Sequence, residues 1–191
     1  RHKFETYPRI LEADRHFQAS YDDVTTVMLT RRLSPLNERN SWLTPWECNE
    51  MLHGGCVHKS VQEALRYHLD GFEFEWLAVT APTRSAGTPH EHIYLWIDDS
   101  DDEVTTNHIA PALERHLKHC VNAHPEHHRY RADGTGGAIT IEHDPDLVEN
   151  KHDAVAERVI SGDTPPRANT IGAQYLASQL AHLPVGDFYA E

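Results

Sequence analysis

The stretch PHEHIYLWI, residues 89–97, decides the fold, because two histidines one residue apart open an apolar run. Side chains alternate faces along an extended strand, so His90 and His92 point to the same side, one pleat apart. The opposite face then carries Ile93, Leu95 and Ile97, a pattern that predicts a core packed under helices. Two imidazoles side by side on a stiff sheet form half of a metal site.

A second feature is the segment NTIGAQYLASQLAHLP, residues 169–184. Its apolar residues fall at i, i+4 and i+7, which predicts a helical stripe made of Leu176, Leu180 and Leu183. Pro184 closes this helix. Tyr175 and Gln179 are one turn apart and share the neighbouring face. A tyrosine at the rim of an apolar stripe is usually a packing residue, so its meaning depends on the histidine strand.

Together these segments resemble the HUH endonucleases of the single-tyrosine type, which include the nickases of rolling-circle replication initiators and of small transposases. Three pieces match in the family's order, namely TVMLTR at 26–31, GTPHEHIYL at 87–95 and QYLASQ at 174–179. The resemblance spans about residues 24–183. It implies that Tyr175 attacks single-stranded DNA at a replication origin through a 5′-phosphotyrosine intermediate, while His90 and His92 bind a divalent metal ion. Host replication proteins are then expected partners.

Two residues depart from the family's pattern. Glu91 stands where an apolar residue is usual, and Ser178 stands where many initiators have lysine. The spacing Tyr-x-x-x-Gln resembles the transposase-like branch, in which the glutamine is the third metal ligand. No carboxylate lies between residues 76 and 89. Gln179 is therefore the preferred third ligand, and Glu75 is the alternative.

The chemistry explains why these residue types belong together. A divalent cation can neutralise the charge of a phosphodiester and orient it for in-line displacement. Two imidazoles with an amide oxygen form a mixed ligand set that suits Mn²⁺ well and Mg²⁺ less well. A phosphotyrosine ester is stable yet reversible, so the cut strand can be rejoined. The predicted cofactor is Mn²⁺ or Mg²⁺.

The chain is strongly acidic, with 30 Asp and Glu residues against 17 Lys and Arg residues and a net charge of −13. A DNA-binding domain usually has the opposite balance. An acid-rich, lysine-poor surface is typical of a protein from a very saline cytoplasm, where the Debye length falls to about 3 Å and self-repulsion is screened. The composition favours a plasmid or virus of a haloarchaeon, and an acidic protein from a mesophile is the alternative.

The length suits a single domain, and residues 1–191 are interpreted as one nuclease domain. Cys48, Cys56 and Cys120 are an odd number without a framework spacing, which favours a reduced, cytoplasmic protein. No apolar run reaches membrane length. Because the chain opens on Arg1 rather than methionine, we expect it to be a fragment or the core of a longer replication initiator.

The order of the predicted elements indicates an α+β fold, with a central antiparallel sheet flanked by helices. The resemblance implies that this sheet is ferredoxin- or RRM-like. Capping boxes at Thr44–Glu47 and Ser60–Glu63 open two helices, which Gly54 and Gly71 end. Further helices are expected over 108–123, over 154–160 and in the tyrosine segment. Strands are expected over 24–31 and 72–76, in the histidine stretch and within 134–142.

Alternatives remain for both the metal site and the function. A competing zinc-type ligand set, with an uncommon spacing, would consist of Cys48, His53, Cys56 and His58. The function alternatives are a transposase of a small insertion sequence and a non-catalytic module that binds metal or nucleic acid. A histidine-triad nucleotide hydrolase would need a further histidine where this chain has Tyr94.

Overall fold

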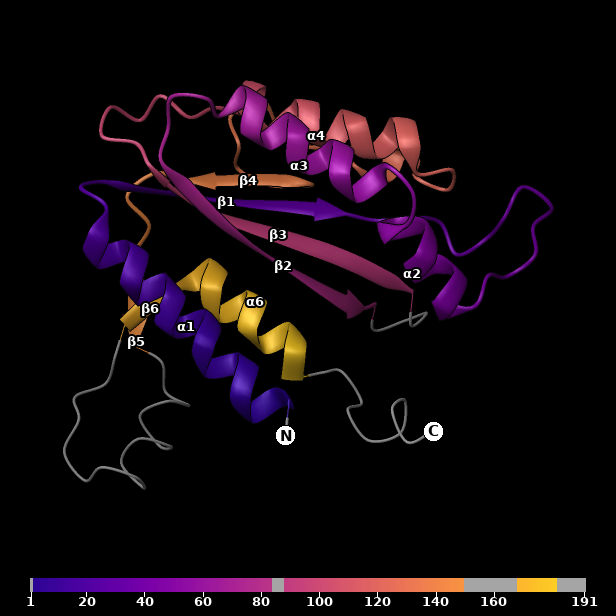
Figure 1. Cartoon of the computed structure of the whole chain (residues 1–191), viewed down its shortest axis with the longest axis horizontal. Helices are drawn as coiled ribbons and strands as arrows, with labels where there is room; N and C mark the ends of the chain where they lie inside the picture. The colour runs from indigo at the N-terminus through magenta and orange to yellow at the C-terminus, as the bar shows by residue number, and fades with distance from the viewer. Residues whose placement is uncertain (1, 84–87, 150–167, 182–191) are drawn as a thin grey trace.

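A four-stranded antiparallel sheet lies at the centre of the chain, with the strand order β2-β3-β1-β4 (Figure 1). The computed structural model describes residues 2–83, 88–149 and 168–181. The strands of the sheet are β1 (Val24–Arg31), β2 (Phe74–Pro82), β3 (Pro89–Asp98) and β4 (Ile139–Glu142). The histidine stretch lies on β3, which is buried along its whole length except at Asp98.

Helices α3 (Val57–His68) and α4 (Thr106–His119) cover one face of this sheet, and the shorter α2 (Pro45–His53) lies beside it (Figure 1). The main apolar core lies between these helices and Ile93, Leu95 and Ile97 of β3, as the alternation along the strand predicts. A β-α-β-β-α-β chain order with this strand order is the ferredoxin-like arrangement. The predicted α+β fold with a central antiparallel sheet flanked by helices is confirmed.

The opposite face of the sheet is covered by two further helices, α1 (His2–Ser20) and α6 (Ile171–Ala181), which lie side by side (Figure 1). A two-stranded sheet made of β5 (Leu147–Glu149) and β6 (Ala168–Thr170) leads into α6. A second apolar core on this face includes Ile10, Leu11, Trp96 and Leu176. The sequence patterns did not predict α1, because Pro8 lies inside it and its apolar residues form no regular stripe.

The capping box at the start of α2 is confirmed. Thr44 Oγ1 accepts a hydrogen bond from the amide of Glu47, and the Thr44 amide donates to Glu47 Oε2 at 2.8 Å. The capping box expected at Ser60 is wrong, because α3 already begins at Val57. The Ser60 hydroxyl lies within the helix and donates to the Val57 carbonyl at 3.0 Å.

Other boundaries also differ from the predicted ones. Helix α4 begins two residues before His108 and ends at His119 rather than Ala123, and a short 3-10 helix follows at Pro125–His127. Strand β2 pairs with β3 as an antiparallel hairpin, as predicted. The helix expected over 154–160, and Leu183 of the predicted stripe, lie outside the described residues. No described helix is both long and apolar enough to cross a membrane.

Candidate metal and nucleophile site

The two histidines of β3 lie on the face covered by α6, as their spacing predicts. Both side chains are buried, and His90 Nε2 lies 3.0 Å from His92 Nε2, with the two ring planes at 87°. Two metal–nitrogen bonds of about 2.1 Å at a right angle would separate their nitrogens by about 3.0 Å. The pair therefore has the spacing of two adjacent ligands of one ion.

Thr30 sets the orientation of the His92 ring. Strand β1 pairs with β3 so that Thr30 lies opposite His92, and Thr30 Oγ1 is 3.0 Å from His92 Nδ1. A ring that donates its Nδ1 proton to this hydroxyl keeps the lone pair on Nε2, the nitrogen that faces His90. This threonine belongs to the first of the three matching segments.

The histidine pair is held in its neutral form. Burial lowers the pKa of His92 to about 3, and the charges of His90 and Arg32 lower it in the same direction. Burial, with Arg32, also lowers the pKa of His90. A histidine binds a metal ion through its neutral imidazole. At neutral pH, neither ring therefore has to lose a proton before it binds an ion.

The two arginines at the end of β1 point to opposite sides of the sheet. Arg31, which the matching segment includes, is fully buried on the α2–α3 side and pairs with Glu91. Arg32 is exposed, lines the cleft beside His92, and its charge lowers the pKa of both histidines. Sequence reasoning did not single out Arg32, although strict alternation from Thr30 would have placed it on the histidine side.

Helix α6 brings Tyr175 to the histidine pair. The Tyr175 ring meets the His92 ring edge-on, with centroids 5.3 Å apart, and 47% of the tyrosine is exposed. Tyr94 shares the histidine face but is buried, and its hydroxyl is 2.8 Å from Thr170 Oγ1. Burial also raises the pKa of Tyr94. Of these two tyrosines, only Tyr175 has its ring both exposed and in contact with a histidine of the pair.

Close packing of α6 on the sheet depends on Gly172. A Cβ atom at this position would lie 2.5 Å from Tyr94 Cε2 and 2.7 Å from the Tyr94 hydroxyl oxygen. Both distances are far shorter than a van der Waals contact, and the Tyr94 ring is buried and cannot move aside. The glycine therefore allows the first turn of α6, and with it Tyr175, to approach β3.

The start of α6 is fixed by a buried carboxylate on α1. Asp14 accepts hydrogen bonds from Trp96 Nε1 at 2.9 Å, from Asn169 Nδ2 at 2.8 Å and from both the amide and the hydroxyl of Thr170. The same Thr170 hydroxyl oxygen accepts from the Ala173 amide at 3.2 Å and so caps α6. Asp14 thereby joins α1, β3 and the helix that carries Tyr175.

The two candidates for a third metal ligand lie on different elements, Gln179 on α6 and Glu75 on β2. Gln179 follows Tyr175 by one turn of α6 and is half-buried. Glu75 is exposed and lies opposite Trp96, whereas the residue opposite His92 is Val79. Four residues of strand separate Glu75 from Val79, about 13 Å. Glu75 therefore cannot complete a site built on the histidine pair.

A cleft of about 320 Å³ opens beside the histidine pair, between α6 and the β1–β4 half of the sheet. Threonines, glycines and the rings of His92 and Tyr175 make up much of its wall, with one cation, Arg32, and one carboxylate, Glu142. Its lining consists of Thr26, Met28, Thr30, Arg32, His92, Tyr94, Gly137, Thr140, Glu142, Ile171, Gly172 and Tyr175.

The alternative zinc set does not assemble. Cys48 is buried in a small apolar cluster, and Cys56 is exposed, with its Sγ 3.4 Å from His119 Nδ1. His53 and His58 converge instead on Glu91. Among the described residues, two groups of three side chains are spaced to hold an ion. Neither group contains a cysteine.

Comparison with known protein families identifies the family of this chain. A family model described as "Putative rep protein (DUF1424)" matches residues 14–182. The chain belongs to this family. The match begins at Asp14 and includes the histidine strand and the whole of α6. The description as a rep protein supports a family of replication initiators. No curated protein matches the chain.

Proposed function

We propose that this rep protein is a metal-dependent, single-stranded DNA endonuclease of the HUH single-tyrosine type. It nicks and rejoins DNA at an origin through a 5′-phosphotyrosine intermediate, and so initiates rolling-circle replication. The observation that carries this proposal is the contact of the Tyr175 ring with His92, whose Nε2 in turn faces His90 Nε2 at 3.0 Å. The family description favours an initiator over an insertion-sequence transposase.

The ligands of the proposed metal ion are His90, His92 and, as the third, Gln179. The donor set of two neutral imidazoles and an amide oxygen fits Mn²⁺ better than Mg²⁺. When bound, such an ion would neutralise the charge of the phosphodiester and polarise it toward displacement. Thr30 keeps the lone pair of His92 directed toward this position.

The nucleophile of the proposed reaction is the phenol oxygen of Tyr175. Its bond to phosphorus forms as the bond from phosphorus to the 3′ oxygen breaks, and the phenol proton is lost while the leaving 3′ oxygen gains one. The product is a 5′-phosphotyrosine and a free 3′ hydroxyl, and the reverse step rejoins the strand. Arg32, at the cleft, would contact the phosphate oxygens and hold the group in line.

The acidity of the chain determines the salt concentration at which the proposed site can bind DNA. At a net charge of −13, DNA would be repelled at low salt, whereas molar salt screens this repulsion. High salt also removes most of the counterion-release gain from phosphate contacts. DNA binding would therefore depend on the metal, on Arg32 and on base contacts in the cleft. The proposed setting is the cytoplasm of a haloarchaeon, with host replication proteins as partners of a plasmid or virus initiator.

A direct test is incubation of the chain with Mn²⁺ and a library of single-stranded oligonucleotides at high salt. We expect a covalent protein–DNA adduct that Tyr175→Phe and His90→Ala/His92→Ala each abolish. Tyr67→Phe is the matched control, because Tyr67 is 76% exposed on α3, away from the cleft, and this variant should form the adduct normally. An adduct that persists in Tyr175→Phe, or that forms equally without a divalent ion, would contradict the proposal.

A further inference from the structure

A second cluster of metal-ligand side chains lies on the opposite face of β3 from the histidine pair. Glu91 points to this face from between His90 and His92 and is buried. His53, the last residue of α2, and His58, in the first turn of α3, converge on it. One ligand atom from each of the three residues lies within 4.8 Å of the others. The distance from His53 Nδ1 to Glu91 Oε1 is 3.3 Å.

The remaining polar atoms of these three residues are already held by neighbours. His53 Nε2 lies 2.9 Å from Thr80 Oγ1, and the side-chain amide of Gln62 lies 2.6 Å from His58 Nε2. Glu91 Oε2 accepts from Arg31 Nε at 2.7 Å. Metal-ligating histidines and carboxylates are characteristically fixed by such partners on the atom that does not face the metal. The atoms left to face an ion are His53 Nδ1, Glu91 Oε1 and His58 Nδ1. The first two are 3.3 Å apart, and His58 Nδ1 also lies 3.5 Å from Arg31 Nη2.

The charges around this cluster select the kind of ion. The Arg31 guanidinium neutralises Glu91 and lies 3.5 Å from His58 Nδ1, so a cation gains little from net negative charge here. Ca²⁺ and Mg²⁺ depend on oxygen ligands and would bind poorly, whereas imidazole nitrogens favour Zn²⁺ or Co²⁺. Burial lowers the pKa of His53 and outweighs the opposing effect of the Glu91 charge.

We propose that His53, His58 and Glu91 bind a divalent transition metal ion of the Zn²⁺ class, with water completing the coordination. The two histidines come from the ends of α2 and α3 that adjoin at Gly54 and Gly55. The ion would therefore fasten this helix junction to the central strand, directly behind the histidine pair. This site is separate from the one that Tyr175 contacts, and it does not depend on the proposed nuclease function.

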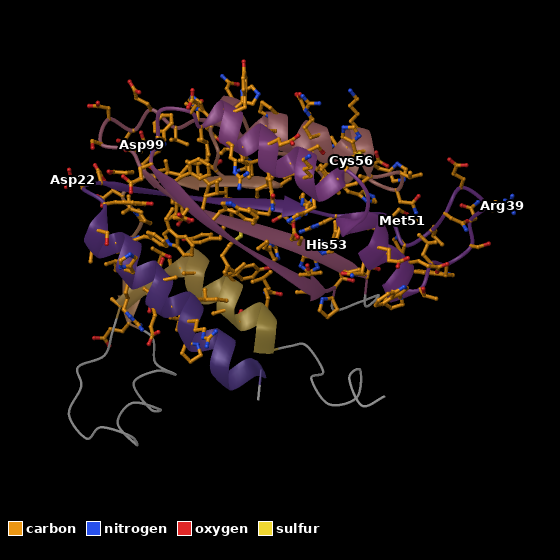
Figure 2. The ribbon with its side chains drawn as sticks, viewed as in Figure 1. Asp22, Arg39, Met51, His53, Cys56 and Asp99 are labelled. Atoms are coloured by element: carbon orange, nitrogen blue, oxygen red, sulfur yellow. The ribbon has the colours of Figure 1, made fainter. Side chains whose placement is uncertain are left out.

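Figure 2 labels His53, which belongs to this site, and Cys56, the exposed thiol of the rejected zinc set. His53 is the last residue of α2, and Cys56 is the residue that precedes α3. His53 contacts Thr80 and Glu91 of the sheet, whereas Cys56 contacts His119 of α4. The glutamate in the middle of the histidine motif, rather than a thiol, thus supplies the third ligand.

The test uses the His90→Ala/His92→Ala variant, so that any metal at the first site is removed from the measurement. After chelation and dialysis, this variant should bind one equivalent of Co²⁺, detected by its visible d–d absorption, and Zn²⁺ should displace the Co²⁺. Adding His58→Asn should abolish this absorption, and adding His53→Asn should do the same. Adding His68→Asn is the matched control, because His68 is an exposed histidine on the same helix, and it should leave Co²⁺ binding unchanged.

Glu91 itself is not substituted, because its loss would leave Arg31 buried without its partner and could prevent folding. Circular dichroism of each histidine variant shows whether the fold is retained. The proposal is overturned if the His90→Ala/His92→Ala variant binds no Co²⁺, or if folded His53→Asn and His58→Asn derivatives bind it as tightly as the His68→Asn control. Neither result would bear on Tyr175 or on nicking.

Discussion

Thr30 shows how a single hydroxyl can decide whether a histidine is ready to bind a metal. Its oxygen lies 3.0 Å from His92 Nδ1, on the neighbouring strand. Removing such an orienting partner typically weakens metal affinity or activity by about 10- to 100-fold. We therefore expect Thr30→Val to reduce Mn²⁺ affinity and nicking in this range, as measured by calorimetry and by adduct yield. Thr30→Ser keeps the hydroxyl and should restore both, and equal affinities in the two variants would show that the contact has no such role.

His116 makes the stability of the fold depend on pH. It is fully buried, its Nε2 lies 2.8 Å from the Arg32 carbonyl oxygen, and burial lowers its pKa to about 3. The unfolded chain binds this proton near pH 6.5 and the folded chain does not, so the stability is present above pH 6.5 and is lost as the pH falls toward 3. Between pH 7 and pH 5 the loss from this one group is about 2 kcal/mol.

Urea denaturation at the two pH values measures this loss. His116→Gln keeps a hydrogen-bond donor for the Arg32 carbonyl but cannot titrate. Its free energy of unfolding should fall by about 2 kcal/mol less than that of the unmodified chain between pH 7 and pH 5. Identical losses in the two proteins would mean that His116 does not titrate in this way.

For single residues, the sequence predicted positions best where the residue type and its spacing pointed to the same role. Strand alternation placed His90 and His92 on one face, and the matching segments drew attention to Tyr175, whose ring contacts His92. The separate places of Arg31 and Arg32 follow from the same alternation, but only once the pairing of β1 is known. The partners of Glu91 could not be predicted, because they come from helices distant in the sequence.

Among the elements, α1 is the one whose importance is least visible in the sequence. It places Asp14 under the start of α6, where the carboxylate accepts hydrogen bonds from Trp96, Asn169 and Thr170. The contacts with Asn169 and Thr170 join residues more than 150 positions apart, so no local pattern could indicate them. By contrast, α2 was predicted well, because its capping box is a local signal.

Asp14→Asn should therefore loosen the helix that carries Tyr175. The new amide would present a donor to the donors of Asn169 and Thr170, and losing charged hydrogen bonds at a buried site costs about 2–4 kcal/mol. Thermal unfolding should show this loss, together with a lower adduct yield under conditions in which the variant stays folded. Asp22→Asn is the control, because Asp22 is exposed at the end of α1 (Figure 2), and it should change neither property. Wild-type stability in Asp14→Asn would contradict the anchoring role.

For the whole molecule, the central antiparallel sheet could be predicted because its elements alternate in a regular order and carry strong local patterns. The second helical layer could be predicted only in part, since its apolar stripe indicates α6 whereas α1 has no such stripe. Together, α1 and α6 bury Tyr94 and Trp96 while leaving Tyr175 half exposed over His92. The fold thus supports the site through a layer that the sequence only partly indicated.

The central claim is that Tyr175 is the residue that becomes linked to DNA, and mapping the adduct by mass spectrometry tests it most directly. Trypsin would leave Tyr175 and Tyr189 in one peptide, residues 168–191, so fragment ions must assign the modified side chain. We expect a nucleotide attached through a phosphate to Tyr175, with no modification of Tyr67, Tyr94, Tyr130 or Tyr189. A nucleotide found on any other tyrosine, in a chain that forms the adduct in the presence of Mn²⁺, would contradict it.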